Sequence, residues 1–294
     1  MSSPIGNQRP PQIAIAGATG RVGAALVSSL LGDNVDVVAL SRSSDASKLP
    51  DAVALSTINF EQPASLLDAL HGSDRLFLSH GTSAQQVTNE IALIDAAVAA
   101  GVSHIVKLSV MGPASKLHPM DWHMEIEAHL ARQDIGYTIL RPSSFVDILA
   151  RAGAPVSAGS WGGAAGHGRV NLIDTRDVAD AARIALLDTE FANSQRAYHL
   201  TGPAPVTMSD VAEELTRLLG KTVTYHHRTP EEQREVLISS GASDLVANVL
   251  LGIDRLFRES VLAETTVTFT ELTGQTPRSV AAWLSENLDV FRRG

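Results

Sequence analysis

The chain has 294 residues, a formal net charge of −9 and no cysteine. The lack of cysteine excludes disulfides, thiolate metal sites and cysteine nucleophiles, and with no sign of an oxidising compartment we expect a cytoplasmic protein. The acidic balance and the absence of a Lys/Arg cluster argue against nucleic acid as a partner, because phosphate neutralisation supplies most of that affinity. No apolar stretch reaches the roughly 18 residues of a membrane span, so no membrane partner is expected either. Residues 1–12 contain three prolines and are interpreted as a frayed leader, not a signal peptide.

A glycine turn follows the first predicted strand. Gly17, Gly20 and Gly23 come directly after the apolar run at 13–16 and before apolar residues at helical spacing. Strand, G-x-x-G-x-x-G turn and helix together are typical of a dinucleotide phosphate cradle, although many βα turns use glycine only structurally. In this interpretation Gly17 allows a tight turn, Gly20 leaves room for a pyrophosphate and Gly23 lets the helix pack closely. The candidate cofactor-binding residues of the turn are Gly17, Ala18, Thr19, Gly20, Arg21, Val22 and Gly23.

Strands and helices then alternate. Short apolar segments predict strands at 35–40, 53–58, 75–79, 104–109 and 137–141, and helical patterns fall at 63–70, 84–100 and 119–132. This alternation implies right-handed βαβ crossovers and a parallel sheet. The predicted fold class is therefore α/β, with a Rossmann-type doubly wound sheet and a smaller, helix-rich C-terminal lobe.

The second half of the chain is less regular. Six glycines between residues 153 and 168 predict a mobile loop, either an inert connector or a loop on the substrate side. We expect a helix at 174–187, a strand at 197–200, a helix capped by Ser209 and ended by Gly220, and a small strand at 223–226. The remainder to residue 291 is predicted mostly helical, broken by the Thr-rich segment 265–273. We expect residues 1–150 to form the NADP-binding domain, with 170–200 returning to it, and 151–294 to form the smaller substrate-binding lobe.

The end of the second strand predicts which dinucleotide binds. An acidic residue there would accept hydrogen bonds from the ribose 2′-hydroxyl of NAD, but this chain has Ser41 and Arg42. A guanidinium can hold a 2′-phosphate with two hydrogen bonds and a hydroxyl can add another, so NADP(H) is expected in preference to NAD(H). The alternative is that Arg42 is only a solvated surface residue.

Ligands of parallel sheets lie outside the carboxyl ends of the strands, which adds candidates at each strand end. Any one of them taken singly could be an ordinary loop position, and His80 is a second polar candidate. Together, the further candidate cofactor-binding residues are Asn59, Phe60, Ser79, His80, Gly81, Ser109, Val110, Pro142, Ser143 and Phe145.

Four segments carry a family resemblance. They are the glycine turn, the Arg42 turn, residues 136–142 (GYTILRP) with Phe145, and the helix start at 175–179 (TRDVA). In this order they resemble the NmrA-like, atypical short-chain dehydrogenase/reductase family, and within it the bacterial NAD(P)H:quinone oxidoreductases. The resemblance spans roughly the first 190 residues and is weaker beyond them.

The catalytic pair of most short-chain dehydrogenases is absent. Tyr137, Tyr198 and Tyr225 all lack the lysine four residues on that would lower the pKa of a catalytic tyrosine. The resemblance places His123 where related isoflavone-type reductases have lysine and quinone-reductase relatives have histidine. It therefore implies that His123 is the catalytic residue and a cofactor contact beside the nicotinamide, as proton donor or as positioning donor, and that 142–145 face the nicotinamide. The alternative is a helix histidine that merely packs or solvates.

The resulting function hypothesis is an NADP(H)-dependent oxidoreductase that transfers hydride to a small electron acceptor such as a quinone or activated carbonyl. One alternative is a non-catalytic NADP sensor of the NmrA type that acts through a protein partner. Another is a biosynthetic imine or enone reductase. No metal site is expected, since His226 and His227 are adjacent on a predicted strand and point to opposite faces. The sequence leaves the oligomeric state open, a homo-oligomer included.

Overall fold

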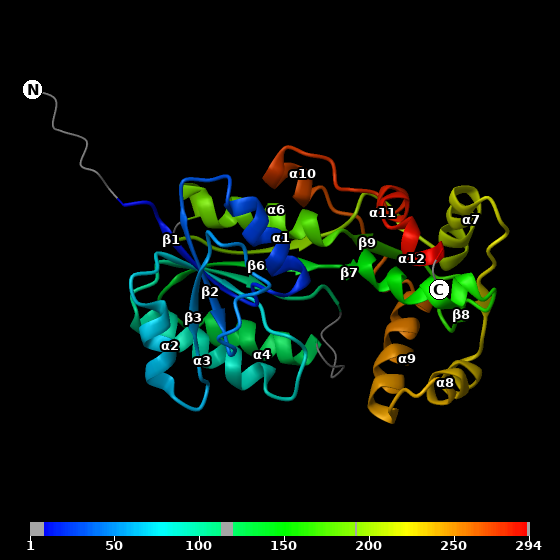
Figure 1. Ribbon diagram of the computed structural model, residues 1–294, viewed down its shortest axis with the longest axis horizontal. Coiled ribbons are helices and arrows are strands. Elements are labelled where there is room, and N and C mark those ends of the chain that lie inside the picture. The colour runs from blue at the N-terminus through cyan, green and yellow to red at the C-terminus, as the bar shows by residue number, and fades with distance from the viewer. Residues whose placement is uncertain (1–8, 113–119, 192, 293–294) are drawn as a thin grey trace, which may run out of the picture. The chain divides into compact units, whose positions relative to one another are not determined.

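The computed structural model describes residues 9–112, 120–191 and 193–292 (Figure 1). These residues pack into two units. The sheet unit holds the described residues of Met1–Leu108, Glu125–Leu140 and Ala179–Ala197, and the helical unit holds those of Ser109–Met124, Arg141–Val178 and Tyr198–Gly294. The expected domain boundary at residue 150 stays a prediction.

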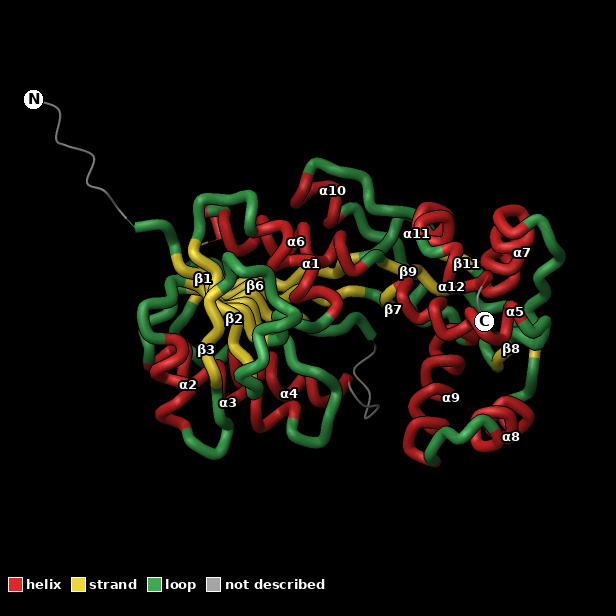
Figure 2. The backbone as a smooth tube through the Cα atoms, in the orientation of Figure 1, coloured by secondary structure: helices red, strands yellow, loops and turns green. Residues whose placement is uncertain are grey.

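A seven-stranded sheet forms the centre of the sheet unit (Figure 2). Strand β1 pairs in parallel with β2 on one side and β4 on the other, so that Ala14 lies opposite Val38 and Leu76. The pairs β2–β3, β4–β5 and β5–β6 are parallel as well. The strand order is β10-β6-β5-β4-β1-β2-β3, so the order reverses between β1 and β4, which is the position where such sheets bind ligands. The strands are β1 (Gln12–Ala16), β2 (Asp36–Ser41), β3 (Ala54–Thr57), β4 (Arg75–Leu78), β5 (His104–Leu108), β6 (Gly136–Pro142) and β10 (Gln195–Leu200).

Helices cover both faces of this sheet. Leu66, Leu93 and Ile126 come from three successive helices and pack in one core with Leu76 and Ile105 of the strands. Figure 1 shows α2, α3 and α4 on that face and α1 and α6 on the other. The helices of this region are α1 (Arg21–Leu30), α2 (Pro63–Leu70), α3 (Gln86–Ala99), α4 (Met120–Leu130) and α6 (Thr175–Leu187), with the 3-10 turn η2 (Thr189–Phe191). The expected Rossmann-type sheet is confirmed.

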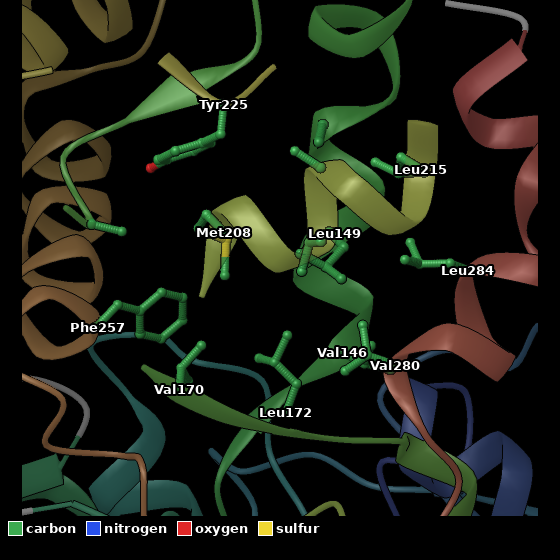
Figure 3. Close-up of a cluster of buried hydrophobic side chains, with 14 of the residues drawn as sticks. Val146, Leu149, Val170, Leu172, Met208, Leu215, Tyr225, Phe257, Val280 and Leu284 are labelled. Carbon is green, nitrogen blue, oxygen red and sulfur yellow. The ribbon is translucent and has the colours of Figure 1, made fainter. Parts of the chain in front are cut away.

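The helical unit has its own apolar core, which Figure 3 shows around Val146, Leu149, Leu172, Leu215 and Leu284. Two small sheets border it, in the orders β11-β9-β7 and β12-β8. The strands are β7 (Ser144–Phe145), β8 (Gly162–Gly163), β9 (Val170–Ile173), β11 (Pro205–Val206) and β12 (His226–His227). The helices are η1 (Val146–Ala152), α5 (Gly153–Ser157), α7 (Met208–Leu219), α8 (Pro230–Ser239), α9 (Asp244–Arg258), α10 (Thr268–Thr273), α11 (Val280–Glu286) and α12 (Leu288–Arg292).

Four local predictions about this half of the chain were wrong in detail. The glycine-rich segment 153–168 is not simply a loop, because it contains α5 and β8 and because Gly163 lies against the buried Tyr225 hydroxyl. The helix α7 is capped by Thr207, not Ser209, since the Thr207 hydroxyl accepts from Asp210 N and the Asp210 carboxylate accepts from Thr207 N. The segment 265–273 includes α10, and the small strand lies at His226–His227.

Two further predictions fall partly outside the described residues. These are the leader at residues 1–12, of which 1–8 are not described, and the helix predicted at 119–132, whose first residue is not described. Within the part of the chain that the structure describes, none of the helices combines the length and the apolar character needed to cross a bilayer.

Candidate functional site

The glycine turn between β1 and α1 is built so that side chains are excluded from it. Gly17 has φ +81°, and a Cβ on it would lie 2.7 Å from the Ser79 carbonyl oxygen. A Cβ on Gly23 would lie 2.1 Å from the Gly17 carbonyl oxygen, so only glycine lets α1 approach the turn this closely. The Gly20 amide closes the turn by donating to the Gly17 carbonyl at 2.9 Å. The tight turn and the close helix packing expected at Gly17 and Gly23 are confirmed.

The start of α1 is electrostatically suited to an anion. Gly20 is the N-cap, and among the described residues no side chain accepts a hydrogen bond at this cap and no acidic residue occupies the first turn. A helix N-terminus presents amide donors and a partial positive charge, which favour phosphate. Thr19, Gly20 and Arg21 are exposed, whereas Ala18 and Val22 are buried beneath them. The turn therefore has an apolar base and an open polar rim.

The end of β2 carries the two residues predicted to favour NADP(H) over NAD(H). Ser41 is half-buried, and its hydroxyl accepts from the Ser43 amide at 3.0 Å, which shapes the turn. Arg42 follows with an exposed side chain. The structure thus presents the guanidinium to solvent at the carboxyl end of the strand next to β1.

The loops that follow β3 and β4 are in contact through two aromatic side chains. Phe60 and His80 make an edge-to-face contact with centroids 6.1 Å apart. Ser79 lies against Gly17, while Asn59 and Gly81 are exposed. The structure therefore brings the predicted residues after β1, β3 and β4 into one neighbourhood of the sheet unit.

The imidazole of His80 is held by two neighbours. Its Nδ1 lies 2.7 Å from the Gly81 carbonyl oxygen, which can only accept, so Nδ1 carries the proton. Its Nε2 lies 3.0 Å from the buried Asn89 Nδ2. Both ring nitrogens are thus used within the protein, so His80 orders its loop. Asn89 is not among the residues predicted from the sequence, where its signal is a polar residue on the apolar face of α3.

The remaining predicted residues lie in the helical unit. His123 is on α4 and is 8% exposed, and Ser109 is buried. Val110 is half-buried and packs against the core of this unit. Pro142 accepts from the Met111 amide at 2.8 Å. Phe145 is half-buried in β7, which pairs with β9.

The Ser143 side chain has an unusual environment. It is 4% exposed, and its Oγ has no hydrogen-bond partner among the residues that the structure describes. Its backbone amide donates to the Leu200 carbonyl at 2.9 Å, which fixes its place after β6. A buried hydroxyl without a partner is costly, so this atom is suited to a ligand that completes its hydrogen bonding.

A family model described as NAD(P)H-binding matches residues 17–189, from the first glycine of the turn to just past the end of α6. The chain belongs to the NAD(P)H-binding family. The dinucleotide-binding family expected from the sequence is thereby confirmed.

Relatives of this NAD(P)H-binding chain match it over nearly their whole length. Quinone oxidoreductase 2 of Escherichia coli (strain K12) is 31% identical, over 95% of this chain and 99% of the relative. The NAD(P)H azoreductase of Xenophilus azovorans is 28% identical over the same shares. The crystal structure of the NADPH-dependent quinone oxidoreductase QOR2 of Escherichia coli complexed with NADPH superposes with a TM-score of 0.86 at 29% identity, covering 94% of this chain and 99% of that one.

The described residues fit the cofactor that an NAD(P)H-binding protein requires. The glycine turn offers a cradle that any Cβ at Gly17 or Gly23 would fill, next to an uncapped helix N-terminus. Ser143 offers a buried hydroxyl that lacks a partner within the described chain. The helix N-terminus suits the phosphate groups of such a ligand, and the Ser143 hydroxyl suits an uncharged hydrogen-bonding group.

Proposed function

We propose that this chain is an NADPH-dependent reductase that delivers hydride to quinones or to related small electrophiles such as azo compounds. The observation that carries the proposal is the side-chain-free glycine cradle at the start of α1, in a chain matched end to end by a quinone oxidoreductase and an azoreductase. The partner is accordingly a small-molecule electron acceptor. A cytoplasmic location is inferred only from the lack of cysteine.

NADPH is proposed over NADH because of the end of β2. Arg42 is exposed there and Ser41 precedes it, and neither is an acidic residue that would bind a free ribose hydroxyl pair. A guanidinium forms charge-assisted hydrogen bonds to a 2′-phosphate, each worth roughly 1.5–3 kcal/mol. The glycine turn, together with Asn59, Phe60 and Ser79, would hold the rest of the adenosine and pyrophosphate half.

The chain's own residues would position the dinucleotide and the acceptor and would supply a proton, but they would not donate electrons. When bound, the dinucleotide supplies the hydride. The Ser143 hydroxyl would donate a hydrogen bond to the nicotinamide half, with Ser109, Val110, Pro142 and Phe145 lining it. A quinone that accepts hydride becomes a stabilised phenolate, so it needs no strong acid. His123 would donate a proton or a positioning hydrogen bond to that oxygen.

The buried Tyr225 offers no replacement acid. Tyr225 is buried, and that burial raises its pKa well above the usual value, helped by the nearby Asp254 charge. A phenol that resists ionisation this strongly is a poor partner for proton transfer near neutral pH. The proposed acceptors are therefore those whose reduction does not depend on a catalytic tyrosine.

One observation favours the alternative of an NADP sensor. Helices α8 and α9 expose large apolar side chains at 40–47% of their area, the surface that a protein partner would cover. These residues are Val236, Ile238, Val246 and Val249. A sensor would bind NADPH without turning it over.

A screen of NADPH oxidation against quinones, azo dyes and enones decides between the candidates. We expect turnover with at least one quinone or azo compound, measured as the loss of NADPH absorbance. Turnover of enones alone would favour the biosynthetic reductase. Tight NADPH binding with no turnover of any class would favour the sensor, and no binding of NADPH would overturn the proposed function altogether.

A further inference from the structure

A fully buried ion pair lies inside the sheet unit. The Lys107 ammonium and the Glu90 carboxylate are 2.8 Å apart, and both side chains are 0% exposed. Removing two charges from water is costly, and apolar replacements of buried ion pairs are often equally stable or more so. Stability alone therefore does not explain why β5 and α3 carry this pair in the interior of the sheet unit.

The pair continues into a short polar chain on α3. Gln86 is 1% exposed, and its Nε2 donates to the second Glu90 oxygen, Oε1, at 3.0 Å. Gln86 and Glu90 are four residues apart and so share one face of the helix. Further along that face Leu93, Ile94 and Ala97 are apolar core residues. On the buried face of α3, only the first turns, beside the carboxyl end of β5, are polar.

The other end of the chain is a backbone carbonyl. The Lys107 ammonium also donates to the carbonyl oxygen of Leu108, the last residue of β5. Because the peptide unit is planar and trans, fixing this carbonyl also fixes the direction of the Ser109 N–H. Lys107 thus sets the orientation of the peptide with which the loop 109–112 begins.

We propose that Lys107, held by Glu90 and Gln86, is a positioning residue that orders the start of the 109–112 loop for NADPH. The proposal rests on the proposed function, in which Ser109 and Val110 line the dinucleotide. Lys107 is fully buried, so its ammonium bonds to the protein and acts on the cofactor only through the loop. Its hydrogen bond to the Leu108 carbonyl orients the loop backbone before the ligand arrives.

The test uses the full chain with the double substitution Lys107→Met and Glu90→Gln. It removes both charges, nearly keeps both volumes and leaves an oxygen to accept from Gln86. We expect faster amide hydrogen exchange in 109–112 of the ligand-free protein. We also expect an NADPH Kd raised about two- to tenfold, the worth of one hydrogen bond. In turnover, KM for NADPH should rise while KM for the acceptor stays unchanged, a split that a general loss of structure would not produce.

The control is the partly exposed ion pair of Arg183 and Asp33, which also lies in the sheet unit but joins α6 to the turn after α1. Arg183→Met with Asp33→Asn should leave the 109–112 exchange and the NADPH Kd unchanged. Parental exchange and Kd in the Lys107/Glu90 variant, or the same change in the control, would overturn the proposal.

A variant that fails to fold and a parent that fails to bind NADPH have different consequences. If the double variant does not fold, Lys107→Leu together with Glu90→Gln, which also removes both buried charges and the donor to Leu108, takes its place with the same expectations and the same overturning result. If the parent protein binds no NADPH, the proposed function fails, whereas the exchange measurement on ligand-free protein still tests whether Lys107 orders the loop.

Discussion

At the scale of single residues, Arg42 is the side chain expected to choose the cofactor. Replacing it in Arg42→Ala should raise the Kd for NADPH about tenfold or more and leave that for NADH unchanged, because only NADPH carries the 2′-phosphate. Fluorescence titration with both nucleotides measures this. Arg132→Ala, another exposed arginine, is the control. Equal Kd values for NADPH before and after Arg42→Ala would remove the residue from the site.

His104 is a buried residue that links pH to stability. It is 0% exposed, with Nε2 3.0 Å from Thr138 Oγ1, and burial, followed by the Arg75 charge, lowers its pKa to about 4. The unfolded chain, with its ordinary pKa near 6.5, therefore binds more protons between these values. The free energy of unfolding should fall by about 3 kcal/mol as pH drops from 6.5 to 4.

Denaturant titrations across this pH range test the His104 prediction. In His104→Gln, which cannot bind a proton at this position, the part of the pH slope due to His104 should disappear, although the variant is less stable at neutral pH. Other groups titrate in the same range, so the difference between parent and variant is the relevant quantity. Parallel pH profiles for the two proteins would contradict the assignment.

At the scale of elements, the strand–turn–helix unit β1–α1 separates a packing glycine from a binding glycine. A Cβ at Gly23 meets the Gly17 carbonyl at 2.1 Å, whereas a Cβ at Gly20 lies 3.2 Å from the same oxygen, in a backbone conformation open to alanine. Gly23→Ala should displace α1 and lower the unfolding midpoint by several degrees. Gly20→Ala should keep the midpoint close to that of the parent.

Gly23→Ala should mainly lower stability, whereas Gly20→Ala should mainly weaken NADPH binding. Gly20→Ala places a methyl group on the open rim where the pyrophosphate is expected, so its NADPH Kd should rise out of proportion to its small loss of stability. Thermal melts and NADPH titrations of both variants give this comparison. If Gly20→Ala binds NADPH like the parent, the pyrophosphate does not approach this turn.

At the scale of the whole molecule, cofactor binding should stabilise the fold by mass action. NADPH at about 100 times its Kd adds about 2.7 kcal/mol to the free energy of unfolding. A thermal melt should therefore shift upward by several degrees with NADPH and less with the same concentration of NADH. In Arg42→Ala the difference between the two nucleotides should vanish. A larger shift with NADH would reverse the predicted preference.

The sheet unit could be predicted largely from sequence because its signals are local. Strands buried on both faces are nearly continuous apolar runs, such as Ile13–Ala16, and glycine marks the turn that follows. The helical unit was harder to predict from the sequence. Thr207 rather than Ser209 caps α7 because Asp210 completes a reciprocal capping box with it. Several glycines of 153–168 allow close packing, as at Gly163 against Tyr225.

The sequence by itself determined the α/β class, the glycine cradle and the family, because each is recognised from patterns within short segments and from the order of those segments. Tertiary structure alone revealed the Lys107–Glu90 pair, the Asn89 contact that fixes His80, and the Ser143 hydroxyl without a described partner. These depend on which distant segments pack together and on what is then buried. The sequence places Lys107 in a strand but does not show that its side chain is buried. The opening turn could be recognised from spacing, but the polar groups that order the loops around it could not.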